Sequence, residues 1–286
     1  MKRVLIRRVL ITGANSYIGT SFENWIAQWP ERYSVETIDM KEQSWKEKDF
    51  SEYDVVFHVA GIAHVSADPK MEDLYYKVNS ELCIDTAKKA KAEGVKQFIF
   101  MSSIIVYGDS NIAIERSTKP KPSNFYGMSK LKAEEGIISL ENDNFKVVII
   151  RPPMIYGKGS KGNYPKLVNA AQKLPVFPDI NNQRSMLHID NLCKFIQLMI
   201  DNDEQGVFFP QNKEYVKTSE MVRVIAESYE KKIRLIKLFN PFIKLLMKVS
   251  GLINKVFGNL VYDKNMSEYK EDYQIRTFRE SIIASK

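Results

Sequence analysis

Short apolar runs alternate with helix-like stretches through the first half of the chain, and this alternation limits the folds that it can adopt. The apolar runs read as buried strands, and the stretches between them show the apolar spacing of helices. Strands separated by helices pair in parallel, and right-handed crossovers place the helices on both faces of one sheet. The sequence therefore predicts an α/β fold built on a doubly wound parallel sheet. We expect strands at 9–12, 34–38, 54–59, 96–101 and 145–150, and helices at 17–29, 71–93 and 126–140.

The alternation loosens after Arg151. Prolines and glycines make an irregular stretch that runs to Gly162, which favours loops and turns. Further helices are expected beyond it, so we predict a second, smaller and mostly helical domain toward the C-terminal end. These helices are expected near 165–173, 190–201, 218–230 and 241–257.

The chain has 286 residues and a formal net charge of +7, which suits anionic partners. Its basic residues do not form one block with interleaved aromatic residues, so nucleic acid is not an expected partner. The apolar segment 241–257 contains Lys244, Lys248 and Lys255 and is too interrupted to span a bilayer. We read it as part of the second domain and do not expect membrane contact; a helix lying on a membrane surface is the alternative.

Cys83 and Cys193 are the two cysteines, and neither belongs to a CxxC motif or a His-rich cluster. A disulfide framework and a metal site are therefore not expected, and a reducing compartment fits this usage. Residues 1–3 are basic, but the apolar run that follows is broken at once by Arg7 and Arg8. This pattern is not typical of a signal peptide, so we expect a cytoplasmic location.

A glycine-containing turn follows the first expected strand. Gly13 permits a tight turn, and Gly19 lets the next helix pack closely against the sheet. Ser16 stands where the usual middle glycine would be, and its side chain could crowd a bound pyrophosphate. The backbone amides at the helix start, together with the helix dipole, can hold such a group. We therefore expect a dinucleotide to be bound by Gly13, Asn15, Ser16, Tyr17, Ile18 and Gly19.

Asp39 closes the second expected strand, 20 residues after Gly19. A carboxylate at this point accepts hydrogen bonds from the hydroxyls of the adenosine ribose and repels a 2′-phosphate. NAD is therefore favoured over NADP, although Lys41 lies close enough to soften the preference. After the third strand, Ala60 and Gly61 are small and let the cofactor lie near the backbone.

The position of the dinucleotide turn also predicts how the chain is divided into domains. Residues 1–158 are expected to form an NAD-binding, Rossmann-type domain, to which the chain returns near 184–210. Residues 159–286 are expected to form mainly the substrate-binding domain.

Tyr126 is the only one of the 14 tyrosines that has a lysine, Lys130, four residues later. Both residues open a helix, so this spacing puts their side chains on one face. Ser103 follows the fourth strand, and ligands of a doubly wound sheet bind at the carboxyl ends of its strands. We therefore expect Ser103, Tyr126 and Lys130 to meet over the reactive part of the cofactor.

A chemical role follows for each of the three residues. An ordinary phenol has a pKa of about 10, which makes it an inefficient base at neutral pH. The Lys130 ammonium and the positive charge of oxidised nicotinamide would stabilise the phenolate of Tyr126. Tyr126 could then take a proton from a sugar hydroxyl while hydride passes from carbon to the cofactor. Ser103 would hydrogen-bond the same oxygen, and Lys130 would also bind the nicotinamide ribose.

Several motifs occur in the order that one known family shows. They are the glycine turn 13–19, the strand and turn 54–61, Asn79, Met101-Ser102-Ser103, Tyr126-Gly127-Met128-Ser129-Lys130 and Arg151-Pro152-Pro153. In this order they resemble the NAD-dependent epimerase/dehydratase family, the extended short-chain dehydrogenases, over roughly residues 8–200. Within the family, the chain is most similar to UDP-glucose 4-epimerase-like members.

The resemblance implies further site residues. Asn79 would support the catalytic helix and the cofactor, and Pro153 would line the nicotinamide. Asn163 would meet the nucleotide sugar, and Arg184 matches the family position that binds the substrate diphosphate. His188, close to Arg184 in the sequence, is interpreted as structural.

The chain also departs from the family pattern. Sugar dehydratases of the family carry an acidic pair directly after the catalytic hydroxyl residue, whereas Ser103 is followed by Ile104 and Ile105. Dehydration is therefore not expected. Met154 replaces an asparagine that helps to bind substrate in UDP-galactose epimerases, and Ala63 replaces a lysine that contacts the cofactor there. Ordinary UDP-galactose specificity is thus not expected.

The favoured hypothesis is an NAD-dependent nucleotide-sugar epimerase that acts at C4 of a UDP-hexose or UDP-N-acetylhexosamine. It would take hydride from C4 and return it to the other face of the sugar. An NAD(P)H-dependent 4-keto-sugar reductase for surface polysaccharide synthesis is the alternative, favoured by the short chain and Met154. A non-catalytic NAD-sensing protein is a third possibility. A homodimer is also expected, paired through the helices at 71–93 and 126–140, as in family members.

Overall fold

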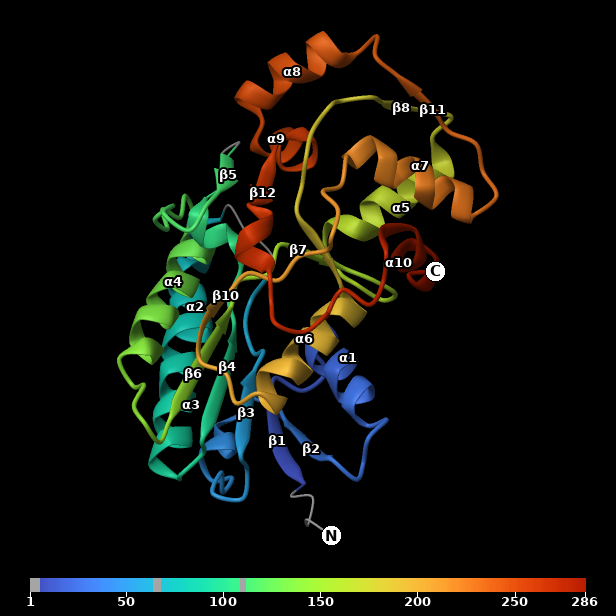
Figure 1. Ribbon diagram of the computed structural model, residues 1–286. Helices are drawn as coiled ribbons and strands as arrows, with labels where there is room; N and C mark the ends of the chain where they lie inside the picture. The colour runs from blue at the N-terminus through green and yellow to red at the C-terminus, as the bar shows by residue number, and fades with distance from the viewer. Residues whose placement is uncertain (1–5, 64–67, 109–111) are drawn as a thin grey trace. The chain divides into compact units, whose positions relative to one another are not determined.

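The computed structural model describes residues 6–63, 68–108 and 112–286, except for the side chains of Ile112 and Leu252 (Figure 1). The basic residues 1–3, considered above for a signal peptide, lie outside the described part. The chain divides into two compact units. The first comprises Met1–Gly108, Pro120–Pro152 and Leu192–Phe209, and the second comprises Asp109–Lys119, Pro153–Asn191 and Pro210–Lys286.

A parallel sheet of six strands forms the centre of the first unit. All five strands expected from the sequence are present, and the predicted doubly wound parallel sheet is confirmed. The sixth strand, β10, pairs in parallel with β6 at the edge, and the sequence analysis missed it. The strand order is β10-β6-β4-β3-β1-β2. The bounds are β1 Arg7–Thr12, β2 Tyr33–Ile38, β3 Val55–His58, β4 Gln97–Met101, β6 Lys146–Ile150 and β10 Gly206–Phe208.

Helices cover both faces of this sheet (Figure 1). Alternate strand residues point to opposite faces, so apolar runs without polar interruption are needed to bury both. On one face, Leu10, Val56 and Phe98 share a core with α3 (Leu82–Ala92) and α4 (Phe125–Ile138). On the other face, Phe57 meets Phe22 of α1 (Tyr17–Ile26) edge to face, with ring centroids 5.2 Å apart. The helix α6 (Ile189–Asp201) follows the second unit's middle segment and leads back toward β10.

The second unit contains more helix than strand, and its three short parallel strand pairs have no counterpart in the pattern expected from the sequence. Its helices are α5 Asn163–Lys173, α7 Thr218–Ser228, α8 Asn240–Val249, α9 Gly251–Phe257 and α10 Phe278–Ala284. The strand pairs are β7 Met154–Tyr156 with β9 Met186–His188, β8 Val176–Pro178 with β11 Arg234–Ile236, and β5 Ile112–Ile114 with β12 Leu260–Tyr262.

Two helical segments differ from the expected ones. The expected helix 71–93 consists of a 3₁₀ turn at Pro69–Met71, α2 (Glu72–Tyr75), a π-helix at Tyr76–Glu81 and α3. The expected helix 241–257 is broken between α8 and α9, where Ser250 caps the second helix by accepting a hydrogen bond from the amide of Ile253. Among the described residues, no helix is both long enough and apolar enough to cross a membrane.

Candidate active site

The turn between β1 and α1 has the backbone shape that the glycine pattern predicts. Gly13 has a φ of +120°, and a Cβ placed on it would lie 2.8 Å from the amide nitrogen of Ala60. The position therefore requires glycine both for its conformation and for its close approach to the end of β3. Asn15 adopts a φ of 61°, in the left-handed region that asparagine tolerates.

The hydroxyl of Ser16 takes part in a hydrogen bond within this turn. It is the N-cap of α1, and its Oγ accepts a hydrogen bond from the amide of Gly19 at 3.1 Å. A Cβ on Gly19 would lie 2.6 Å from that Oγ and 3.2 Å from a side-chain carbon of Ile11. Gly19 thus serves both the cap and the close packing of α1 on the sheet. The serine that replaces the usual middle glycine has a stabilising role at the helix start.

The ends of β2 and β3 place the remaining residues expected around a dinucleotide. Asp39 follows β2 directly, is exposed, and accepts the amide of Lys41 at 2.9 Å through one carboxylate oxygen. The amide of Ala60 donates to the carbonyl of Thr12 at 2.9 Å, which ties the end of β3 to β1. His58 is fully buried, and its ring is bonded to the hydroxyl of Thr12 at 2.7 Å, which is a structural position.

The helix α4 presents one buried face that contains the expected reactive residues. Asn124 caps the helix by accepting the amide of Gly127 at 2.9 Å. Tyr126 and Lys130 are 8 % and 5 % exposed, and Glu134 further along the same face is 1 % exposed. The spacing of four residues between neighbours places all three on the side of the helix that packs against the sheet.

Ser103 and Lys130 both lie at the carboxyl end of β4. The Nζ atom of Lys130 donates to the carbonyl oxygen of Met101, the last residue of β4, at 2.8 Å. The same ammonium lies 4.6 Å from the ring centroid of Phe100. Ser103 follows two residues after Met101, and its Oγ accepts the amide of Ile105 at 3.3 Å. The side chain of Ser103 lies close enough to the Tyr126 hydroxyl to act on its pKa. The structure therefore brings the three expected reactive residues to the carboxyl end of one central strand.

Burial dominates the protonation of this cluster. It raises the pKa of Tyr126 to about 12, although the side chain of Ser103 acts in the opposite direction. Burial lowers the pKa of Lys130 to about 8, against the attraction of Cys83 and Glu134. The expected lowering of the Tyr126 pKa is thus not produced by the protein groups, because desolvation outweighs the effect of Ser103. Further positive charge near the phenol would be needed to form the phenolate at neutral pH.

Asn79 supports this cluster from the π-helix, as the resemblance implied. Its side-chain oxygen accepts the amide of Ile62 at 2.8 Å, and its side-chain nitrogen donates to the hydroxyl of Ser129 in α4 at 3.1 Å. A Cβ on Gly61 would lie 2.9 Å from Asn79 Oδ1 and 3.2 Å from Lys130 Nζ. Gly61 is therefore small because Asn79 and Lys130 fill the adjacent space.

Arg151 and Glu134 form a buried ion pair beside Lys130 that was not predicted from the sequence. Arg151, at the end of β6, donates from Nη2 to Glu134 of α4 at 2.5 Å and from Nε at 3.0 Å. Ser102 donates to the same carboxylate, and Tyr107 accepts from Arg151 Nη1 at 2.7 Å. A signal was available, since Glu134 lies four residues after Lys130 on the same helix face.

The three expected residues beyond Pro152 all lie in the second unit. Pro153 is buried next to the start of β7, and Asn163 is the first residue of α5. Arg184 is half-buried, pairs through its backbone with Val216, and donates from Nη1 to the carbonyl of Gly258 at 3.2 Å. These positions are compatible with ligand binding, and their roles remain predictions.

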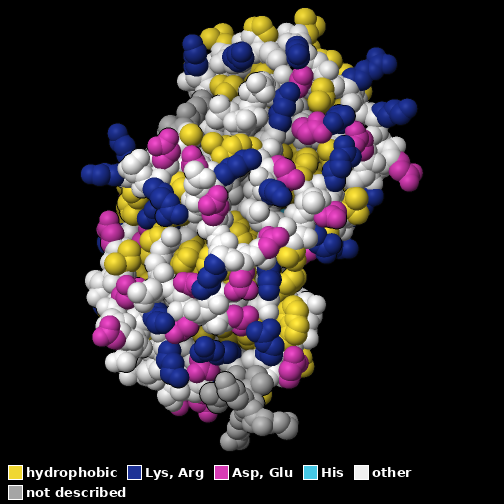
Figure 2. All heavy atoms as spheres, in the orientation of Figure 1, with side chains coloured by type: hydrophobic (Ala, Val, Ile, Leu, Met, Phe, Trp, Pro, Cys, Tyr) yellow, Lys and Arg dark blue, Asp and Glu magenta, His cyan; other side chains and the backbone are white. Residues whose placement is uncertain are grey.

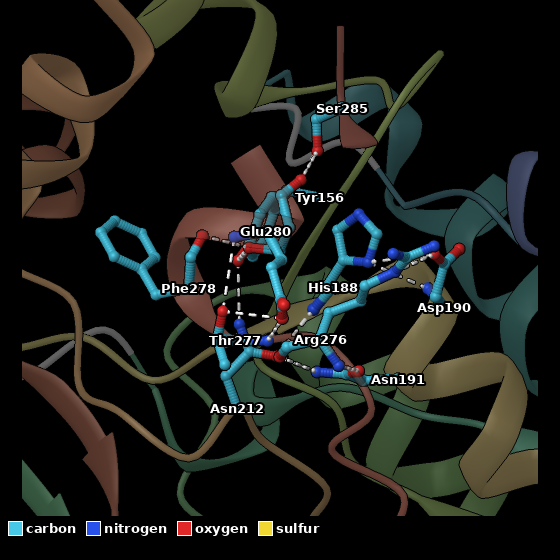
Figure 3. Close-up of polar contacts among 11 residues, drawn as sticks. Tyr156, His188, Asp190, Asn191, Asn212, Arg276, Thr277, Phe278, Glu280 and Ser285 are labelled. Atoms are coloured by element: carbon cyan, nitrogen blue, oxygen red, sulfur yellow. Dashed lines mark hydrogen bonds and ion pairs between the residues drawn. The ribbon is translucent and has the colours of Figure 1, made fainter. Parts of the chain in front are cut away.

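Figure 3 shows a polar network that surrounds His188 in the second unit. Asn212 accepts the amide of His188 at 3.0 Å and donates to the hydroxyl of Tyr156 at 2.9 Å. Asn191 donates to Asn212 at 2.9 Å and accepts the amide of Arg276 at 2.9 Å. Burial lowers the pKa of His188 to about 4. A neutral, buried histidine in such a network fits the structural role expected for it.

The sequence model that describes the NAD dependent epimerase/dehydratase family matches residues 9–209 of the chain. The chain belongs to this family. The match covers the six-stranded sheet, except for the first two residues of β1, and the residues at its carboxyl edge.

Individual members of the family are also similar to this chain. A UDP-glucose 4-epimerase from Vibrio cholerae is 31% identical, over 91% of this chain and 88% of that protein. An N-acetyl-α-D-glucosaminyl-diphospho-ditrans,octacis-undecaprenol 4-epimerase from Escherichia coli O157:H7 is 27% identical, over 87% of this chain and 81% of that protein. The solved UDP-glucuronic acid 4-epimerase from Bacillus cereus, in complex with NAD, has a TM-score of 0.74 at 18% identity, with 97% of this chain and 96% of that chain covered.

This member of the epimerase/dehydratase family has apolar residues after Ser103. Ile104 is buried at 8 % exposure and begins a 3₁₀ turn, Ile104–Tyr107, that packs under α4. The amide of Ile104 donates to the carbonyl of Pro152 at 2.9 Å. The two residues after Ser103 thus begin a 3₁₀ turn and supply no carboxylate.

Proposed function

We propose that this protein is an NAD-dependent nucleotide-sugar epimerase that acts at C4 of a UDP-hexose or UDP-N-acetylhexosamine. The meeting of Ser103, Tyr126 and Lys130 at the carboxyl end of β4 is the observation that carries this proposal. The similarity to the Vibrio cholerae UDP-glucose 4-epimerase over most of both chains supports it. A phenol, a hydroxyl and an amine at one point suit the coupled transfer of a proton and a hydride.

The β1–α1 turn fits the cofactor by its shape. The absence of a Cβ at Gly13 lets the turn lie against the backbone of Ala60, and the first amides of α1 can meet a pyrophosphate. Asp39 would bind the adenosine ribose and select against a 2′-phosphate, so NAD is preferred over NADP. When bound, NAD would supply the hydride acceptor and, in its oxidised form, a positive charge.

Tyr126 is the proposed acid/base. It would take the proton of the C4 hydroxyl when the sugar is oxidised and return a proton to that oxygen when the ketone is reduced. Because burial raises the pKa of Tyr126 to about 12, base action depends on further positive charge, which an oxidised cofactor would supply. Ser103 would hold the substrate oxygen in line. It is itself held by the amide of Ile105.

The second unit would anchor the nucleotide sugar. We assign the sugar-nucleotide contact to Asn163 and the diphosphate to Arg184, whose guanidinium suits a phosphate pair. Pro153 would line the nicotinamide. Removal of water from the sugar is not part of the proposal, because Ile104 and Ile105 stand where a dehydratase has carboxylates.

We also propose a homodimer formed through the helices at 71–93, which include α2 and α3, and at 126–140, which includes most of α4. Three large apolar side chains of these helices are exposed, namely Leu74 at 42 %, Met128 at 38 % and Ile138 at 47 %. A second copy would cover them. The expected cytoplasmic location also stays a prediction.

The test begins with the purified protein and no added cofactor. UDP-N-acetylglucosamine, UDP-glucose and, because of the Escherichia coli relative, undecaprenyl-diphosphate-linked N-acetylglucosamine are incubated with it. Appearance of the 4-epimer, followed by NMR, is the expected result. If NADH is oxidised only when a 4-keto sugar is supplied, the reductase replaces the epimerase. If no substrate turns over while NAD binds, the non-catalytic alternative is favoured.

Tyr126→Phe provides the decisive variant. We expect a loss of turnover of about 10²–10⁴-fold, the usual contribution of a positioned acid or base. NAD binding should persist. Tyr215→Phe is the control, since it also removes one phenolic hydrogen bond, at 2.8 Å to the carbonyl of Tyr262, but outside the cluster. Equal activity of Tyr126→Phe and the parent protein would refute the assignment.

A further inference from the structure

A long basic segment near the C-terminal end has no part in the proposed reaction. Between Glu230 and Asp263 the chain contains no acidic residue. The whole chain carries a formal net charge of +7, from 42 basic and 35 acidic residues, so the seven basic residues of this segment account for all of the excess. They are Lys231, Lys232, Arg234, Lys237, Lys244, Lys248 and Lys255.

Large apolar side chains are exposed within the same segment. Phe242 is 61 % exposed, Leu245 60 % and Val249 79 %, and they all belong to α8. Their spacing of three and four residues puts them on one face of the helix. In the turn before α8, Leu238 and Phe239 are 80 % and 48 % exposed. The unit buries a different side of α8, where Ile243 is 8 % exposed.

Lysines line one edge of this apolar face. Lys244 precedes Leu245, and Lys248 precedes Val249. One position corresponds to about 100° around a helix, so both lysines lie beside the apolar stripe of Phe242, Leu245 and Val249. Both are exposed, and neither forms an ion pair within the described part of the chain. Figure 2 shows yellow side chains with blue ones among them at the top of the view, where Figure 1 places α8.

This arrangement matches a helix that lies in a lipid–water interface. The apolar stripe could enter the acyl boundary, and the lysines beside it could keep their charged ends among the headgroups. A second copy of the chain would fit poorly, because it would bring the same uncompensated positive charge against this face. An anionic surface provides the opposite charge.

We propose that α8, with the turn that precedes it, binds the surface of an anionic phospholipid bilayer. The sequence alone does not favour membrane contact, since lysines interrupt the apolar run. The exposure of the stripe changes that interpretation, because the lysines flank the stripe instead of breaking it. Peripheral binding needs no membrane-spanning helix.

Vesicle co-sedimentation of the full chain tests the proposal. We expect the protein to sediment with vesicles of equal parts phosphatidylglycerol and phosphatidylcholine, and much less with phosphatidylcholine alone. Lys244→Glu with Lys248→Glu should weaken binding by at least about 25-fold, since each lysine near an anionic surface contributes about fivefold. High salt should weaken binding as well. Lys70→Glu with Lys88→Glu, both exposed and outside the segment, is the charge-matched control.

The apolar stripe is tested separately. Phe242→Ser with Leu245→Ser should reduce binding more than tenfold. Leu174→Ser with Ile283→Ser removes two apolar side chains of comparable exposure, 46 % and 63 %, from other elements and should leave binding unchanged. Circular dichroism would establish that each variant is folded.

Three results would overturn the proposal. The first is that the parent protein sediments equally with anionic and neutral vesicles, or that it sediments with neither. The second is unchanged binding by the Phe242→Ser, Leu245→Ser variant. The third is a light-scattering mass that falls from dimer to monomer in that variant without any lipid effect, which would assign the face to a second copy.

Discussion

Lys130 Nζ donates to the carbonyl oxygen of Met101 at 2.8 Å while 95 % of the residue is buried, and its pKa is lowered to about 8. The unfolded chain has a lysine pKa near 10.5. Below pH 8 both states carry the proton, so the folded state bears the full cost of the buried charge. Between pH 8 and 10.5 the unfolded state holds more protons, and stability from this group rises with pH.

Lys130→Met should therefore stabilise the fold while it removes activity. The pKa shift of Lys130 corresponds to about 3 kcal/mol of unfolding free energy, and loss of its hydrogen bond to Met101 costs about 1 kcal/mol. We therefore expect the free energy of unfolding of the variant to be about 2 kcal/mol higher than that of the parent at pH 7. The gain should shrink as the pH rises from 8 to 10.5. Urea unfolding at several pH values measures this. A variant that is less stable than the parent at pH 7 would show that Lys130 does not carry this cost.

Glu134 and Arg151 are expected to depend on each other. Arg151→Met would leave the buried carboxylate of Glu134 without its ion-pair partner and should cost about 3–5 kcal/mol of unfolding free energy. Adding Glu134→Leu should restore much of that loss, because two apolar groups replace the pair. A double-mutant cycle by denaturant unfolding checks this. Additive losses would contradict the coupling. The exposed pair of Arg279 and Glu227, 3.3 Å apart, is the control and should contribute under 1 kcal/mol.

Asp39 is expected to set the choice of cofactor. Asp39→Ala should weaken NADH binding about tenfold or more, by loss of charged hydrogen bonds to the ribose, and should improve NADPH binding by loss of repulsion. Fluorescence titration with both cofactors measures the ratio. Asp49→Ala is a matched control, because Asp49 also accepts an amide two residues ahead, from Ser51 at 2.8 Å. An unchanged ratio would exclude Asp39 from the site.

Gly127 is expected to be indispensable for the start of α4. A Cβ there would lie 2.8 Å from the carbonyl oxygen of Ile105 and 2.8 Å from the Cβ of Pro122. Gly127→Ala should cost about 2 kcal/mol and reduce turnover, since the neighbouring Tyr126 must shift. Gly136→Ala meets only the side chain of Ile84 and gains about 1 kcal/mol of helix propensity, so its effect should be much smaller. Thermal unfolding and kcat distinguish the two.

The sequence predicted the five longer strands and the position of the Tyr126–Lys130 pair on one helix face because both have local signals. Val147 to Ile150 is an uninterrupted apolar run, and the pair Tyr126 and Lys130 has helical spacing. The edge strand β10 has only three residues, too few for any periodicity to appear. The strand pairs of the second unit, such as Met154–Tyr156 with Met186–His188, depend on long-range pairing that no local pattern records.

The sequence indicated where the candidate reacting groups lie but not which residues pack around them. Ser103 was singled out because it follows a strand, and its catalytic role stays a proposal. Arg151 was noted only as part of a motif, because its partner Glu134 is distant in the sequence. The raised pKa of Tyr126 was also missed, since burial is a property of the assembled fold.

The pairing of β10 with β6 has a consequence for synthesis of the chain. The strand β6 ends at Ile150, and its edge partner arrives only with Gly206–Phe208, roughly 60 residues later. At about 5–20 residues per second, a ribosome needs about 3–12 s to make that stretch. During this interval β6 is an open edge of apolar residues on the nascent protein. We expect this window to be when the growing chain most needs a chaperone.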